Sequence, residues 1–157
     1  MIYYAVIDTN IIVSSLIKGD SIPGFIMNLI GNHTIIPIVH NDLIKEYEDV
    51  LKRTKFNFNK EDIMGIINGF MKFGLFYGIN KTDVKFDDES DKKFYDLYSS
   101  FKKEHTAFLI TGNKKHFPNE NNILSPREFL EKIQIYKKET RLMKWTQKVR
   151  QINKKTD

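Results

Sequence analysis

Residues 2–7 form a continuous apolar run, IYYAVI, that ends abruptly at Asp8, Thr9 and Asn10. A run of this length without polar alternation is typical of a strand that is buried on both faces of a parallel sheet. Parallel strands need crossover connections, which are usually helices. The run therefore predicts a sheet covered on both faces, with the acidic residue Asp8 at the carboxyl end of one of its strands.

Strand and helix patterns alternate along the rest of the chain. A second strand is expected over residues 34–39, and because Pro37 cannot donate a ladder hydrogen bond, this strand should lie at an edge or begin late. A further strand is expected over 107–111. Helical patterns are expected at six places, in chain order over 11–17, over 22–30, from 41, from 59 to about 73, from about 90 and from 125. The alternation predicts an α/β fold, a three-layer α/β/α domain around a central parallel sheet.

The composition limits the classes of protein to which the chain can belong. It has 157 residues, 41% of them hydrophobic, which suits one globular domain. It has no cysteine, which excludes disulfide frameworks, thiolate nucleophiles and zinc–thiolate sites. The apolar N-terminus has no basic leader, and no apolar run reaches bilayer-spanning length. We expect a cytoplasmic protein with no membrane partner.

Positive charge is concentrated near the C-terminus. The net charge is +5, and residues 137–157 hold eight Lys and Arg against two acids, a local +6 that leaves residues 1–136 near −1. A near-neutral domain with a basic tail suits nucleic acid as a partner, and the alternative is a merely solvated Lys-rich tail. The tail is expected to form an amphipathic helix that packs on the body or on a second subunit of a homodimer, through Leu142, Trp145, Val149 and Ile152.

Carboxylates are the residues that remain as carriers of chemistry. The chain has no glycine-rich phosphate loop, dinucleotide fingerprint or serine elbow, and its four histidines lack metal-ligand spacing. Ligands of open α/β sheets bind outside the carboxyl ends of the strands, where Asp8 lies and where Asn113 should arrive after the strand over 107–111. A buried acid such as Asp8 needs a partner, and a cation is a natural one.

Two predicted helices carry acids at the margin between core and solvent. Asp91, in the first turn of its helix, lies on the flank of the apolar stripe and can point toward the sheet edge. The helix dipole alone would also favour an acid there, and Asp88 is a candidate N-cap. On the helical pattern that starts at residue 41, Glu46 and Glu48 flank the stripe on opposite sides, so helical geometry does not choose between them.

Four short motifs occur in the order and spacing of a known family. They are VIDTN at residues 6–10, EYEDVLKR at 46–53, DESD at 88–91 and LITGN at 109–113. Together they resemble the PIN domain family, and the resemblance covers about residues 2–131. It is greatest to a bacterial branch described as toxin components of toxin–antitoxin pairs (VapC-like).

The resemblance implies a PIN-like nuclease domain over residues 1–136, dependent on Mg²⁺ or Mn²⁺ and usually acting on RNA. It implies that Asp8, Glu46 and Asp91 are the metal ligands and catalytic residues, which selects Glu46 over Glu48. Oxygen ligands of this kind suit Mg²⁺. Asn113 stands where many members have an aspartate, so it would be a neutral ligand and a second ion is in question.

Residues around the implied acids have supporting roles in this interpretation. Asn10 would orient Asp8 by hydrogen bonding, and Asp88 and Thr111 are further supporting candidates. The RNA backbone would be contacted by Lys114, Lys115 and His116, for which an ordinary solvated loop is the alternative.

Three functional hypotheses follow from the sequence. The first is a metal-dependent ribonuclease that is the toxin of a pair and is inhibited by a small antitoxin protein. The second is an RNA-processing nuclease without an antitoxin. The third, from another class, is an RNA-binding module with degenerate catalysis, which Asn113 makes conceivable.

Overall fold

The computed structural model describes the backbone of residues 1–156, and all their side chains except those of 135–137, 139–140 and 152–156. Ile152, part of the predicted tail stripe, thus has its side chain outside the described residues, and Asp157 lies outside them altogether. The elements are β1 Tyr3–Ile7, α1 Thr9–Ile17, α2 Ile22–Gly31, β2 Ile35–Val39, α3 Asn41–Leu51, α4 Lys60–Phe73, β3 Leu75–Phe76, α5 Glu89–Lys102, β4 Phe108–Ile110, the 3₁₀ turn η1 Lys114–His116, β5 Ile123–Leu124, α6 Pro126–Lys132 and α7 Ile135–Thr156.

The chain divides into two compact units, Met1–Pro126 and a second unit from Arg127 onward. The first unit contains the whole sheet, and the second contains most of α6 and α7. The functional division that the sequence suggests, with a nuclease domain over 1–136 and a basic tail over 137–157, stays a prediction. In the described part of the chain, no helix combines the length and the apolar character needed to cross a membrane.

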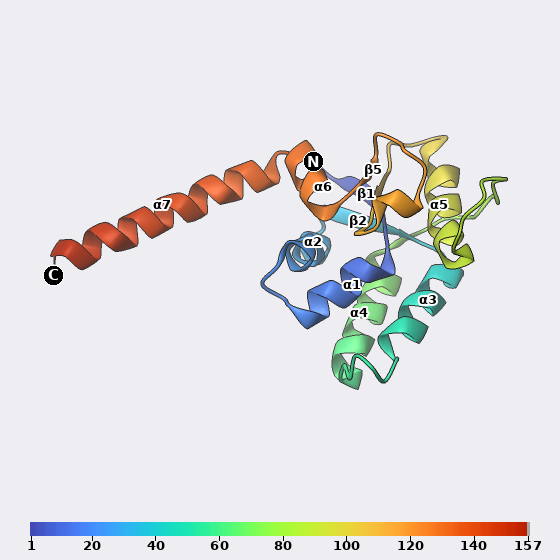
Figure 1. Cartoon of the computed structure of the whole chain (residues 1–157), viewed down its shortest axis with the longest axis horizontal. Helices are drawn as coiled ribbons and strands as arrows, with labels where there is room; N and C mark the ends of the chain where they lie inside the picture. Colours follow the sequence, from blue (N-terminus) through green and yellow to red (C-terminus); the bar gives the residue numbers. More distant parts are fainter. Residues whose placement is uncertain (157) are drawn as a thin grey trace. The chain divides into compact units, whose positions relative to one another are not determined.

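The sheet has five strands in the order β3-β2-β1-β4-β5, and all its pairings are parallel. In Figure 1, α1 to α4 lie on one side of the strands and α5 lies on the other, as right-handed crossovers require when the chain reverses direction across the sheet. The predicted three-layer α/β/α fold with a central parallel sheet is confirmed. The reversal occurs between β1 and β4, and this is the topological switch point where ligands bind in such sheets.

The prediction that the second strand lies at an edge or begins late is wrong. β2 begins at Ile35 and lies between β3 and β1. Tyr3 donates to the Thr34 carbonyl, whereas Val39 accepts from Tyr77, so by alternation the nitrogen of Pro37 faces the β3 side. β3 begins only opposite Ile38, and no ladder bond is lost at the proline.

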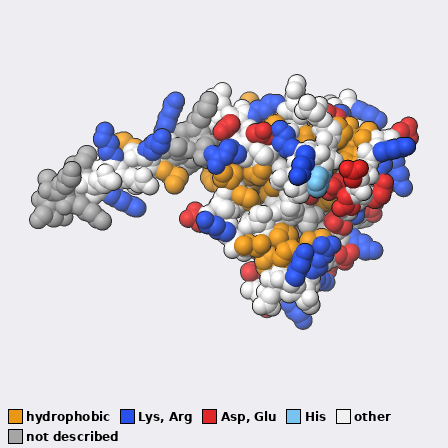
Figure 2. Space-filling view, viewed as in Figure 1, with side chains coloured by type: hydrophobic (Ala, Val, Ile, Leu, Met, Phe, Trp, Pro, Cys, Tyr) orange, Lys and Arg blue, Asp and Glu red, His pale blue; other side chains and the backbone are white. Residues whose placement is uncertain are grey.

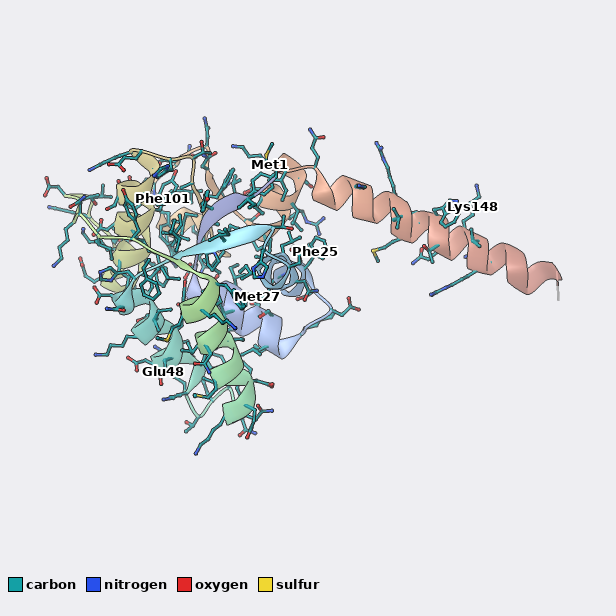
Figure 3. The ribbon with its side chains drawn as sticks, turned by 180° about the vertical axis from the view of Figure 1, so that it is seen from behind. Met1, Phe25, Met27, Glu48, Phe101 and Lys148 are labelled. Carbon is teal, nitrogen blue, oxygen red and sulfur yellow. The ribbon has the colours of Figure 1, made fainter. Side chains whose placement is uncertain are left out.

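The helices bury the faces that the sequence pattern predicts. On α3 the buried residues are Leu43, Ile44, Tyr47, Val50 and Leu51. Asn59 caps α4 by accepting from the amide of Asp62. Helix α5 is almost wholly buried along its second half, where Phe101, labelled in Figure 3, packs against Tyr4 of β1. These contacts hold β1, β4 and α5 together below the carboxyl edge of the sheet.

The connection between β3 and α5 is fixed to α5 by a buried carboxylate. Asp96 is 3% exposed and accepts from the amide and hydroxyl of Thr82, at 3.1 and 2.7 Å. Lys92 bridges the same two residues, since its Nζ lies 2.7 Å from Asp96 Oδ2 and 2.7 Å from the Thr82 carbonyl. This cluster anchors the long segment that leads into the first turn of α5.

Candidate active site

Asp8 lies at the switch point between β1 and β4. Its amide donates to the Ile110 carbonyl of β4 at 2.9 Å, and its backbone forms the N-cap position of α1. The side chain is buried, with 6% exposure. Burial raises the pKa of Asp8 to about 6, an effect that the Thr111 hydrogen bond opposes and the Asp91 charge reinforces. The group is therefore an acid that folding places where its charged form is costly.

Two neighbours fix the orientation of the Asp8 carboxylate. Thr111, at the end of β4, donates its hydroxyl to Asp8 Oδ2 at 2.7 Å. Asn10 donates to the same oxygen at 3.2 Å, while its own carbonyl accepts from the Gly112 amide at 3.1 Å. Asn10 thus ties the start of α1 to the segment after β4. Both residues contact Asp8 as a supporting role requires.

Tyr47 is a residue near Asp8 that the sequence reading counted only as core. Its hydroxyl donates to the Ile7 carbonyl at 2.5 Å, so α3 is tied to the last residue of β1. Burial, and then the Asp8 charge, raise the pKa of Tyr47 well above its ordinary value. The only signal of this role in the sequence was the position of Tyr47 beside Glu46. A tyrosine that only packs in the core and a tyrosine whose hydroxyl bonds to a strand have the same sequence pattern.

Asp91 lies in the first turn of α5 with its side chain 16% exposed, and its Oδ2 lies 3.3 Å from His116 Nδ1. Burial raises the pKa of Asp91, the charges of Asp88 and Glu46 add to this effect, and His116 opposes it. The charge of Asp91 acts in turn on Asp8. Asp91 therefore lies within electrostatic range of both Asp8 and Glu46.

The two candidate glutamates of α3 point in different directions. Glu46 is 21% exposed, and its Oε2 lies 3.1 Å from Lys93 Nζ of α5. Glu48 pairs with Lys52 of its own helix, on the outer side of α3 where Figure 3 labels it. Glu46 thus faces the helix that carries Asp91, and Glu48 faces solvent.

Asp88 and the segment after β4 lie around these acids. Asp88 is the N-cap of α5, since it accepts from the Ser90 amide at 2.9 Å. Hydrogen bonds from the side chain of Ser90 and then from its backbone hold the pKa of Asp88 below its ordinary value. Asn113 is exposed, and its amide donates to Thr111 Oγ1 at 3.0 Å. In η1, Lys115 and His116 are exposed and Lys114 is half-buried.

The donor chemistry of this cluster fits a divalent cation. Mg²⁺ and Mn²⁺ prefer oxygen ligands such as carboxylates and amide carbonyls. Burial, reinforced by the charge of Asp91, raises the pKa of Asp8, and a cation at this carboxylate would favour its charged form. Figure 2 shows acidic side chains gathered on one area of the first unit, with a histidine beside them. Among the described residues, no three His, Asp or Glu side chains are arranged to hold an ion together. Lys93 contacts Glu46, and His116 contacts Asp91.

Residues 4–115 match the sequence profile of the PIN domain family. This span covers most of the chain and includes Asp8, Glu46, Asp91 and Asn113. The chain belongs to the PIN domain family. Proteins with a PIN domain are in general metal-dependent nucleases, and the matched span ends before α6, short of the predicted limit near residue 131.

One relative of this PIN domain is an uncharacterized protein, MJ1680, of Methanocaldococcus jannaschii. It is 29% identical over 146 residues, which cover 83% of this chain and 92% of that protein. No solved structure matches the chain.

The basic partners of the acids are the other residues that the sequence did not single out for this site. Nothing in the sequence pattern indicated that Lys93 contacts an acid, and His116 was predicted to contact the RNA backbone rather than Asp91. Both pairs join segments far apart in the chain, α3 with α5 and α5 with η1. A local pattern cannot reveal such pairs, since they depend on how the helices meet.

Proposed function

We propose that this PIN domain is a ribonuclease that hydrolyses RNA phosphodiester bonds with Mg²⁺ or Mn²⁺. The observation that carries the proposal is the buried Asp8 at the switch point of the sheet, with Asp91 near enough for its charge to act on Asp8 and for the charge of Glu46 to act on Asp91. Partly buried like charges are costly unless a cation joins them.

Asp8, Glu46 and Asp91 would hold the ion, with the amide oxygen of Asn113 as a neutral fourth donor. Glu46 and Asp91 are partly exposed, so their side chains can turn from Lys93 and His116 toward Asp8. When bound, a divalent ion would lower the pKa of a water molecule and offset charge on the phosphate oxygens. Because Asn113 is uncharged, we expect one tightly held ion at most in the free protein.

In this proposal, residues of the chain orient the Asp8 carboxylate and neutralise the phosphate charge of the RNA. Asn10 and Thr111 both donate to Asp8 Oδ2 and so fix the orientation of the carboxylate. Lys93 and His116, once released by the acids, are placed to contact a phosphate oxygen of the RNA. Lys114 and Lys115 extend this positive edge along η1, as a polyanionic substrate requires.

The toxin role, with a small antitoxin protein that covers the acids, is a finer proposal that rests on the resemblance to the toxin branch. It places the protein in the cytoplasm with its RNA. Expression in cells should arrest growth, and co-expression of a protein encoded beside it should relieve the arrest. Growth that continues during production of active nuclease would favour the RNA-processing alternative.

Asn113 supports one second candidate, an RNA-binding module with degenerate catalysis, because a missing carboxylate weakens metal binding. Cleavage of total RNA by the full chain, with Mn²⁺ and with chelator, decides between the two. We expect cleavage with Mn²⁺ and none with chelator. RNA binding without cleavage under either condition would contradict the nuclease proposal. Parallel purification of the Asp8→Asn variant controls for contaminating nucleases.

A further inference from the structure

Helix α7 carries a stripe of basic side chains. The charged side chains that the structure describes on it are all basic, namely Lys138, Arg141, Lys144, Lys148 and Arg150. Arg141, Lys144 and Lys148 follow one another at spacings of three and four residues, so they share one face and span about 10 Å along the axis. Figure 3 labels Lys148, whose side chain projects outward from the helix.

An exposed tryptophan stands beside this stripe. Trp145, the single tryptophan of the chain, is 66% exposed. It lies one turn after Arg141 and one turn before Lys148, so a cation flanks its ring on either side along the helix. Leu142, 55% exposed, and Val149 continue the apolar side of the ring. An exposed apolar patch rimmed by charged residues is typical of an interaction site.

We propose that this face of α7 binds single-stranded RNA, with Trp145 stacking on a base and Arg141, Lys144 and Lys148 contacting phosphates. Aromatic rings set in a basic surface are how proteins hold single strands without sequence preference, because every base offers a flat face and every nucleotide a phosphate. The choice of RNA as the strand rests on the proposed ribonuclease function.

Other occupants fit the face less well. Lys138 lies four residues before Leu142 and seven before Trp145, in line with the apolar stripe, so a charge interrupts the surface that a membrane helix would bury. Pairing with a second copy of α7 would gather Arg141, Lys144 and Lys148 of both chains, and over residues 135–156 the sequence holds a single acid, Glu139, against eight Lys and Arg. A polyanion complements this charge pattern.

The emission of Trp145 in the full chain tests the proposal directly. With chelator present, so that no metal-dependent cleavage occurs, oligouridylate RNA should quench this emission in a saturable and salt-sensitive way. A duplex should not quench it, because paired bases cannot stack on the ring. Unchanged emission with the single strand overturns the proposal. A blue shift on anionic vesicles, or with rising protein concentration alone, also overturns it if RNA gives no quenching.

Matched variants distinguish RNA contacts made by the basic stripe from a general effect of the positive charge of the helix. Replacing Lys144 and Lys148 by Gln should lower the slope of log affinity against log salt by about 0.7 for each lost contact. Arg150→Gln, which removes one charge from the opposite face, should leave the slope unchanged, and an equal loss there would contradict the proposal. By anisotropy of labelled RNA, Trp145→Ala should weaken binding by about tenfold, whereas Met143→Ala should not.

The outcomes also separate this proposal from the nuclease proposal. Quenching by RNA in a protein that never cleaves with Mn²⁺ leaves the α7 proposal standing and removes the nuclease. Cleavage without quenching does the reverse.

Discussion

At the scale of single residues, the buried carboxylate of Asp8 destabilises the folded protein when it is charged. Burial raises its pKa from 3.8 to about 6, so the folded state prefers the protonated form. The stabilising effect of this preference is fully present below pH 3.8 and is lost as the pH rises through 6. At neutral pH the metal-free protein therefore retains a destabilising charge, as expected for a group kept for function.

Asp8→Asn should remove this pH dependence. In the presence of chelator, the variant should gain stability relative to the wild type between pH 4 and pH 6, with an upper limit of about 3 kcal/mol at neutral pH. Asn can still accept the hydrogen bond from Thr111. Urea unfolding of both proteins across this range measures the difference. A difference that is constant with pH would contradict the raised pKa.

In the proposed site, the neutral side chain of Asn113 would limit how strongly the free protein binds metal. We expect Asn113→Asp to tighten Mn²⁺ binding, because an added carboxylate strengthens the attraction for a divalent ion in a partly desolvated cleft. Calorimetric titration of both proteins gives affinity and stoichiometry. Equal values would show that residue 113 lies outside the metal site.

At the scale of elements, α5 depends on the buried cluster that anchors the segment before it. Asp96→Ala should lower the free energy of unfolding by about 3 kcal/mol, since it leaves Lys92 and Thr82 without their buried partner. Glu48→Gln is the control, because its exposed pair with Lys52 should contribute less than about 1 kcal/mol. Urea unfolding compares them, and equal losses would mean that Asp96 does not anchor the segment.

The sequence predicted the longer elements well because their signals are local. The unbroken run before Asp8 and the cap at Asn59 both have physical causes within a few residues. β3 and β5 were missed, since each has two residues and is defined by its partner strand. Pro37 was misjudged for the same reason, because the length of β3 decides whether its missing donor matters.

In the candidate site, too, features with local sequence signals were predicted and features that depend on packing were not. Asp8 and Asn113 were placed from strand ends, which local pattern can identify. The choice of Glu46 over Glu48 came from family resemblance, and the pairing of Glu46 with Lys93 depends on how α3 meets α5. Contacts between helices are properties of packing and have no signature in a single segment.

At the scale of the whole molecule, we propose that the acids around Asp8 form one catalytic cluster that acts on RNA. The PIN domain places Asp8 where the sheet reverses direction, with Asp91 within electrostatic range of Asp8 and of Glu46, and basic residues of α5 and η1 pair with Glu46 and Asp91. The central claim is that these acids together hold the metal that RNA hydrolysis needs. Asp8 is the strictest test, because its replacement by Asn should stabilise the fold and any loss of activity cannot come from unfolding.

The decisive measurement is the single-turnover rate of RNA cleavage with Mn²⁺ for wild type, Asp8→Asn and Glu48→Gln. We predict that Asp8→Asn lowers the rate by at least about a hundredfold, because the ion and its hydroxide lose a charged ligand. Glu48→Gln, on the outer side of α3, should cleave at the wild-type rate. An Asp8→Asn protein as fast as wild type would contradict the account.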